Sequence, residues 1–167
     1  MSTLVDHQIR NLARSADAIQ PYSEEQLNPA SYNLRIGTKG IIETPRGRRT
    51  VDLTNGFKVV PGGWILTDVE ELISIPSDVE AQVILRSSAA RRGWDHALAG
   101  YVDPGYEGRL TLEFVNCLKY EHLTIQTGMQ MVQLKLSGLD ALPERDYSLT
   151  GRYSGATEVE DCKDSTL

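Results

Sequence analysis

The sequence predicts a mainly β protein, a barrel or a sandwich, that begins with one short helix. Its 167 residues suit a single domain with a hydrophobic core of its own. From Tyr32 onward, short apolar stretches follow one another at close spacing, separated by Gly, Pro, Asn and Asp. Many short strands at such spacing favour a barrel or sandwich over βαβ units. Because no repeat or domain linker interrupts the chain, we expect residues 1–167 to form one domain.

The first segment is expected to form the helix. Ser2 or Thr3 can cap it, and its apolar residues recur on one face. Those apolar residues are Leu4, Val5, Ile9, Leu12 and Ala13. Residues 20–31, QPYSEEQLNPAS, then break the regular pattern with two prolines.

A series of later stretches is predicted to form strands, because each combines apolar residues with flanking turn residues. They are residues 32–37, 40–44, 50–54, 57–60, 63–76, 80–85, 109–116, 122–127 and 129–137. Residues 91–100, RRGWDHALAG, interrupt the strands and have room for one helical turn. The tail from Tyr147 is polar and contains glycine, and we expect residues 150–167 to form a mobile C-terminal lid.

Composition argues against several classes of protein. The net charge of −6 disfavours a general nucleic-acid-binding surface, although a local arginine cluster could still bind a small anion. Two distant cysteines, Cys117 and Cys162, are too few for a disulfide framework and fit a reducing compartment. The N-terminal segment lacks a secretory signal, and no stretch approaches the ~20 apolar residues of a membrane helix. We expect a cytoplasmic protein that binds neither nucleic acid nor membrane.

Residues 86–91, RSSAAR, form a candidate anion site. Ser87 and Ser88 would stand where a short helix begins, and the free main-chain N–H groups there favour an anion. Arg86 and Arg91 add guanidinium donors that suit phosphate. In the alternative interpretation, which composition alone favours, the serines only cap the helix and the arginines are solvated.

A turn signal follows in YVDPGYEG, residues 101–108. Pro104 and Gly105 fit the central positions of a type II turn that Asp103 begins, since this turn wants proline and then a residue with positive φ. Taken alone, such a turn is most simply an ordinary hairpin.

An acidic residue stands in the next predicted strand, RLTLEFVN. Strand alternation places Glu113 on the polar face with Arg109 and Thr111, opposite the leucines and the phenylalanine. Glu113 could point into water, which is the usual case, or into a polar cavity beside the arginine cluster. In such a cavity, burial against Arg91 would set the pKa of Glu113 for proton transfer.

Common metal and nucleotide motifs are missing from the sequence. The chain has three histidines but neither a Cys-x-x-Cys pair nor a His-x-Glu element, so neither a zinc nucleobase-deaminase site nor a tetrahedral structural zinc site is expected. There is also no Walker loop and no Gly-x-Gly-x-x-Gly. No metal-ligating residue is predicted.

In their order and character, several stretches make the chain resemble the dCTP deaminase family, which shares a superfamily with trimeric dUTPases. They are LNPASYNLRIG, FKVVPGGWILTDVEELISIP, LRSSAARRGW, AGYVDPGYEGRLTLEFVN, TGMQMVQLKL and YSLTGRYSGAT. The most specific part is Arg-Ser-Ser-x-x-Arg followed by Asp-Pro-Gly-aromatic-x-Gly-x-x-x-x-Glu.

The resemblance implies a distorted β-barrel or jelly-roll subunit of the dUTPase-like type, in a homotrimer with active sites between subunits. It implies hydrolytic, zinc-independent deamination of dCTP to dUTP, with Mg²⁺ bound through the triphosphate and dTTP as an inhibitor. By position, Glu113 resembles the glutamate that activates water and moves protons. Ser87, Arg91 and the main chain of Ala99 resemble the groups that hold that water and that glutamate.

The resemblance also implies a set of substrate-binding residues. Arg86 and Ser88, with Ser87, resemble phosphate-side residues. Asp103 resembles the residue at the deoxyribose 3′-hydroxyl, and Tyr106 the aromatic that packs on the sugar and excludes a 2′-hydroxyl. The expected set also includes Gln133 and Tyr153.

The chain departs from the family pattern at three positions. Asn33 stands where an aspartate is usual, Leu98 where a threonine precedes the water-holding alanine, and Ala156 where a glutamine touches the base in relatives. Three alternatives to a single-activity deaminase therefore stay open. They are a bifunctional dCTP deaminase–dUTPase that gives dUMP and pyrophosphate, a dUTPase alone, and a non-catalytic nucleotide-binding regulatory trimer.

Overall fold

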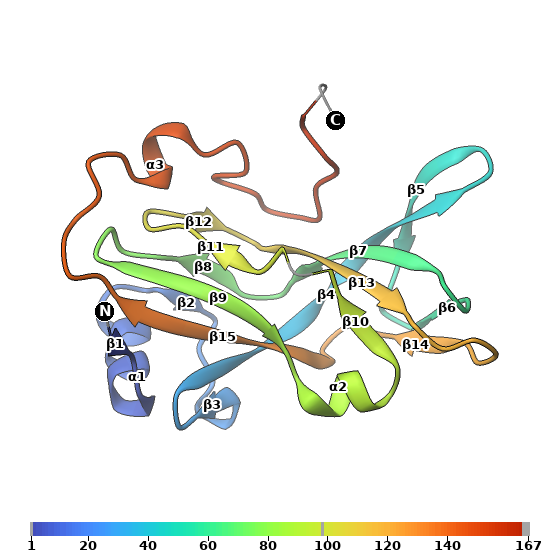
Figure 1. Ribbon diagram of the computed structural model, residues 1–167, viewed down its shortest axis with the longest axis horizontal. Coiled ribbons are helices and arrows are strands. Elements are labelled where there is room, and N and C mark those ends of the chain that lie inside the picture. The colour runs from blue at the N-terminus through green and yellow to red at the C-terminus, as the bar shows by residue number, and fades with distance from the viewer. Residues whose placement is uncertain (1, 98, 165–167) are drawn as a thin grey trace.

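The computed structural model describes residues 2–97 and 99–164, and it is mostly β, with 44% strand and 13% helix. The prediction of a mainly β fold is confirmed. A curled sheet wraps around the core, with α1 and β1 at one side, α2 at the lower edge and the C-terminal segment across the top (Figure 1). Within the described residues, no helix is long and apolar enough to cross a membrane.

The elements up to the middle of the chain are β1 (Ser2–Thr3), α1 (Asp6–Ser15), β2 (Ile19–Gln20), the 3-10 helix η1 (Glu24–Gln26), β3 (Leu27–Asn28), β4 (Ser31–Thr44), β5 (Gly47–Asp52), β6 (Phe57–Val59), β7 (Trp64–Val69), β8 (Leu72–Ser74) and β9 (Val79–Leu85). The remaining elements are α2 (Ser87–Arg91), β10 (Trp94–His96), β11 (Tyr101–Val102), β12 (Glu107–Gly108), β13 (Thr111–Asn116), β14 (Leu123–Ile125), β15 (Gln130–Gly138) and α3 (Tyr147–Thr150).

One large sheet has the strand order β10-β13-β7-β4-β15-β9-β11, and β1, β3 and β5 pair along its sides. Smaller sheets are formed by β12-β8-β2 and by β14-β6. The named strands pair antiparallel throughout the described part of the chain. Because neighbours in the sheet come from distant parts of the sequence, residues from both halves of the chain meet on its concave face.

The N-terminal helix was predicted correctly, but its cap was not. Ser2 and Thr3 form strand β1, which pairs with the end of β15, and Val5 is the residue at the N-cap. The Val5 N–H donates to the side chain of Gln8 at 3.0 Å, and no hydroxyl group caps the helix. Ile9 and Ala13 are buried as expected, whereas Val5 is exposed because it stands before the helix.

Several predicted strands have different bounds in the structure. The stretches 32–37 and 40–44 form one long strand, β4, whose pairing with β7 shifts between Ile36 and Gly40. The stretch 63–76 is two strands, β7 and β8, that belong to different sheets. Residues 91–100 contain strand β10, which was not predicted, instead of a helical turn, while the short helix expected to begin at Ser87 or Ser88 does begin at Ser87.

A buried ionic network around Glu71 joins η1 and β4 to the turn between β7 and β8. The carboxylate of Glu71 is fully buried and accepts hydrogen bonds from the Gln26 side chain, the Arg35 main-chain N–H and Arg35 Nε at 2.8, 3.0 and 2.8 Å. Asn33, the unusual residue of this segment, accepts from Asn28 and donates to Gln130, both at 2.9 Å. The oxygen and the nitrogen of the Asn33 amide each form a hydrogen bond, so this buried side chain is held in one orientation.

Candidate active site

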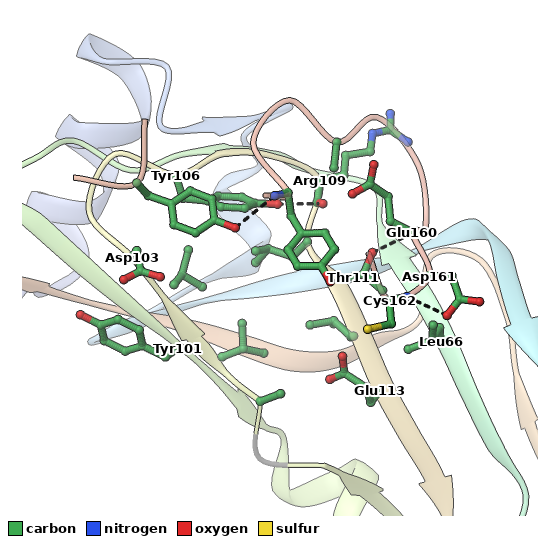
Figure 2. A pocket seen from close by; sticks show the side chains of 18 of the residues that line it. Leu66, Tyr101, Asp103, Tyr106, Arg109, Thr111, Glu113, Glu160, Asp161 and Cys162 are labelled. Carbon is green, nitrogen blue, oxygen red and sulfur yellow. Dashed lines mark hydrogen bonds between the residues drawn. The ribbon is translucent and has the colours of Figure 1, made fainter. Parts of the chain in front are cut away.

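A pocket of about 370 Å³ lies on the concave side of the large sheet. Strands β7 and β13 form its floor, the turn after β11 forms one wall, and the C-terminal segment covers it. Figure 2 shows Asp103 and Tyr101 at one side of this pocket, with Leu66 and Cys162 at the other. A pocket of this size can hold a small organic molecule.

Glu113 lies on the floor of the pocket; strand alternation placed it on the polar face of the strand but left open whether it faces water or a cavity. On β13 the leucines and the phenylalanine are buried in the core, and Glu113, directly opposite Leu66 of β7, faces the cavity. The carboxylate atom Oε2 is buried and has no hydrogen-bond partner among the described residues. Burial raises the pKa of Glu113 above its ordinary value, while the β13 main chain and the nearby His96 act in the opposite direction. A half-buried carboxyl group with a raised pKa is suited to accept and return a proton.

The expected proximity of Glu113 to Arg91 does not occur within one chain. Arg91 is exposed at the end of α2 and does not line the pocket. Two causes were expected to set the pKa of Glu113. Burial is one of them and acts as expected, whereas Arg91 of the same chain does not contribute.

The predicted type II turn forms at the opposite wall. Gly105 has a φ of +81°, and the Tyr106 N–H donates to the Asp103 carbonyl at 3.2 Å. The Tyr106 ring is buried, its hydroxyl donates to the Arg109 carbonyl at 2.9 Å, and it packs on the ring of Tyr147 with a centroid distance of 5.5 Å. The turn therefore holds Asp103 and Tyr106 against the pocket in fixed positions.

Ala99 lines the pocket from the loop that joins β10 to β11. This loop is fastened at both ends: the Val83 N–H donates to the Gly100 carbonyl at 2.6 Å, and the His96 ring contacts the Glu113 carbonyl. Leu98, the departure from the family pattern, lies outside the described residues.

A second group of predicted site residues gathers around α2, away from the pocket. Ser87 and Ser88 are exposed at the start of this helix, and no side-chain hydrogen bond caps it. Arg86 Nη1 donates to the Gln130 carbonyl at 2.8 Å. Gln133, on β15 opposite Ile84 of β9, accepts a hydrogen bond from the Ser31 hydroxyl at 2.8 Å. The structure thus brings together Ala99, Asp103, Tyr106, Glu113 and Tyr153, but leaves Arg86, Ser87, Ser88, Arg91 and Gln133 apart from them within one chain.

The C-terminal segment packs over the pocket through main-chain hydrogen bonds. Gly155 N–H donates to Glu107 at 2.7 Å, Arg109 N–H donates to Ala156 at 2.7 Å, and Glu160 N–H donates to the Thr111 hydroxyl at 3.1 Å. Tyr153 and the buried Ala156 line the pocket from this segment. Whether this lid opens stays a prediction.

The site residues chosen from the sequence leave out several side chains that line the pocket, among them Arg48, Arg109 and Tyr147. Arg109 could have been found, because the sequence pattern already placed it on the polar side with Glu113, although the strand itself begins only at Thr111. Arg48, on β5, carries no signal in the sequence, because only the fold brings it to the pocket. The described residues contain no group of three or more His, Cys, Asp or Glu side chains that could hold a metal ion.

Comparison with known proteins places the chain in a family. A family model described as dCTP deaminase-like matches residues 3–139. The chain belongs to the dCTP deaminase-like family. Its relatives are named as enzymes, and the chain is an enzyme of this family.

Curated relatives of this family match along nearly their whole length. A "dCTP deaminase, dUMP-forming" of Aquifex aeolicus is 34% identical over 93% of this chain and 91% of its own length. A protein of the same name from Nanoarchaeum equitans is 33% identical over 96% and 98%. A "dCTP deaminase" of Pyrococcus horikoshii is 35% identical over 84% and 86%.

Solved structures show the same fold. The 2′-deoxycytidine 5′-triphosphate deaminase of Agrobacterium tumefaciens matches 81% of this chain with a TM-score of 0.69 and 22% identity, and this chain covers 48% of that longer chain. The EIAV dUTPase matches 77% of this chain, and 88% of its own, with a TM-score of 0.52 and 16% identity. The expected dUTPase-like fold class is thereby confirmed.

Proposed function

We propose that this protein deaminates dCTP by hydrolysis, giving dUTP and ammonia for pyrimidine deoxynucleotide metabolism in the cytoplasm. The observation that carries the proposal is Glu113, a half-buried carboxyl group that faces the pocket with a raised pKa and an unpartnered oxygen. The names of the curated relatives support dCTP as the substrate.

In this reaction Glu113 takes a proton from a water molecule whose oxygen bonds to C4 of the cytosine ring. That proton passes to the ring nitrogen N3, Glu113 then carries the second proton of the water to the exocyclic nitrogen, the C4–N bond breaks, and ammonia leaves. The ring keeps the water oxygen as the carbonyl of uracil. The buried Oε2 atom is suited to this work, because no described residue forms a hydrogen bond with it and it is free to bind a proton.

The rest of the pocket would hold the nucleoside. Asp103 is the proposed partner of the 3′-hydroxyl, and the buried ring of Tyr106 would pack on the sugar and exclude a 2′-hydroxyl. The main chain at Ala99 would help to hold the water. Tyr153 would close the pocket from the C-terminal segment.

The active protein is proposed to be a homotrimer with shared sites. Arg86, Ser87, Ser88, Arg91 and Gln133 would reach the pocket of a neighbouring subunit and bind the phosphates and the catalytic water. This arrangement is supported by the exposure of Ser87, Ser88 and Arg91 and by their absence from the pocket of their own chain. Mg²⁺ would enter with the triphosphate, the reaction would not need zinc, and dTTP would compete for the same pocket.

A second candidate function is the bifunctional reaction, in which dUTP is further cleaved to dUMP and pyrophosphate. Two observations favour it: the relatives from Aquifex aeolicus and Nanoarchaeum equitans carry the dUMP-forming name, and Asp103 lies in the same pocket as Glu113. Asp103 would direct a different water to the α-phosphate.

Product analysis tests both functions. Purified protein is incubated with dCTP and Mg²⁺, and dUTP, dUMP and pyrophosphate are separated over time. Formation of dUTP alone supports a single-activity deaminase, and dUMP with pyrophosphate supports the bifunctional enzyme, in which Asp103→Asn should suppress pyrophosphate release more than ammonia release. Cleavage of dUTP without any attack on dCTP contradicts both and leaves a dUTPase. Binding without turnover of either nucleotide indicates a regulatory trimer.

A further inference from the structure

Two arginines line the pocket, and only one of them forms an ion pair with the C-terminal segment. Arg48 forms an ion pair with Asp161, which lines the same pocket, and its guanidinium lies 4.9 Å from the centroid of the Trp64 ring. The acidic segment therefore already neutralises Arg48. Arg109 is the second arginine, and its ion-pair partner comes from the floor of the sheet instead.

The main chain of Arg109 is held from both sides. Its N–H donates to Ala156 at 2.7 Å, and its carbonyl accepts from the Tyr106 hydroxyl at 2.9 Å. Its side chain stays 38% exposed, and Nη1 lies 3.7 Å from the Oδ2 atom of Asp68. Because this contact is longer than a normal hydrogen bond, the guanidinium keeps N–H donors for a ligand.

Asp68, the ion-pair partner of Arg109, is buried in the sheet and has little room to move. It stands opposite Thr111 in the pairing of β7 with β13, is 1% exposed, and its Oδ1 atom has no hydrogen-bond partner among the described residues. Its carboxylate packs directly against Gly37. A side chain at position 37 would not fit, because its Cβ atom would lie 2.2 Å from Asp68 Oδ1. Burial raises the Asp68 pKa, and Arg109 acts against that rise.

We propose that Arg109 binds the triphosphate of the nucleotide and that Asp68 is the positioning residue that aims its guanidinium at the pocket. The inference rests on the proposed function. Arg109, two residues before β13 begins, and Glu113, within β13, line the same pocket. They are four residues apart, so their Cα atoms are separated by at most about 14 Å. That distance is comparable with the length of a nucleoside triphosphate, so the base can lie at Glu113 while the phosphates reach Arg109.

A purely structural role gives different expectations. If Arg109 only neutralises Asp68, then Arg109→Ala lowers stability by leaving a buried carboxylate unpaired, and the double variant Asp68→Asn/Arg109→Ala restores both stability and ligand binding. If Arg109 binds the triphosphate, the double variant restores stability alone.

The experiment titrates the wild type, Arg109→Ala, Asp68→Asn and the double variant with dCTP, deoxycytidine and inorganic triphosphate, each with Mg²⁺, and measures thermal unfolding. Arg109→Ala should weaken the binding of dCTP and of inorganic triphosphate about tenfold or more, because a charge-assisted hydrogen bond is lost, and should change deoxycytidine binding less than about twofold. Asp68→Asn should weaken triphosphate binding without lowering the unfolding temperature, and Arg109→Lys should recover part of the affinity. Arg46→Ala, an exposed arginine outside the pocket, is the control of equal charge.

Wild-type affinity for triphosphate in the double variant would overturn the inference, as would equal losses for dCTP and deoxycytidine in Arg109→Ala. Absence of dCTP turnover by the wild-type protein contradicts the proposed function and not this inference, which is read from the binding of inorganic triphosphate.

Discussion

The Nδ1 atom of His96 lies 3.2 Å from the main-chain carbonyl oxygen of Glu113. The Ala97 N–H reaches the same carbonyl at 3.4 Å, so two contacts join the end of β10 to the strand that carries Glu113. The loop that follows brings Ala99 into the same pocket. The relative placement of Ala99 and Glu113 therefore depends on His96, which is itself buried and packed against Phe114.

We expect His96→Leu to lower dCTP turnover by on the order of tenfold to a hundredfold, because a small misplacement of the catalytic groups is costly. His96→Asn should retain more activity, since its amide nitrogen can replace Nδ1 as the donor. Comparing turnover with dCTP affinity in the two variants checks this. If folded His96→Leu and folded His96→Asn turned over dCTP at the same rate, the contact would have no positioning role.

The raised pKa of Glu113 predicts how stability changes with pH. The folded carboxyl group binds its proton more tightly than the unfolded one, so the native state is relatively favoured below the unfolded pKa, about 4.3, and loses stability as pH rises through the folded pKa. Glu113→Gln should therefore be more stable than the wild type at pH 7, and the difference should shrink toward pH 4. Thermal unfolding across this range measures it, and a difference that does not depend on pH would contradict the assigned burial.

How far the sequence predicts this site depends on how local each feature is. The face of the strand on which Glu113 lies was predictable, because β13 alternates regularly and its apolar residues face the core, but whether that face borders a cavity depends on the rest of the fold. The turn at Gly105 was equally predictable, because it rests on one proline and one glycine. The helix cap was not, because Ser2 and Thr3 pair with β15, more than a hundred residues away.

The separation of α2 from the pocket could not be predicted either. Alternation and capping signals say which way a side chain points but not where a strand lies in a sheet. The curled sheet brings Val83 of β9 into the same pocket as Glu113, but α2 begins only after β9 has ended, and its residues do not line the pocket. Arg91 is thereby left exposed and away from Glu113 of its own chain.

Because Arg91 is exposed, Arg91→Ala should leave the melting temperature nearly unchanged while turnover collapses. Mixed trimers of Arg91→Ala and Glu113→Gln subunits should then recover activity, up to roughly a quarter of the wild-type rate, because some sites receive one intact residue from each neighbour. Inactive mixtures that contain properly assembled trimers would contradict shared sites. Loss of folding in proportion to loss of activity would instead make Arg91 a structural residue.

Removal of residues 150–167 should impair turnover more than stability. The segment is fixed by a few contacts with the barrel, such as the hydrogen bond from Gly155 to Glu107 and the ion pair of Lys39 with Glu158, so it can open at low cost. Hydrogen exchange at the amides of Gly155 and Glu160 should slow when dCTP binds. Equal protection with and without dCTP would mean that the segment does not act as a lid.

The most direct test of the account compares the wild type with Glu113→Gln in the presence of dCTP and Mg²⁺. The glutamine is nearly the same size but cannot take a proton, so ammonia release should fall by about 10²–10⁴-fold while dCTP affinity stays within a few-fold. Ammonia release close to the wild-type rate from the folded variant would contradict the account, because it would remove Glu113 from the reaction.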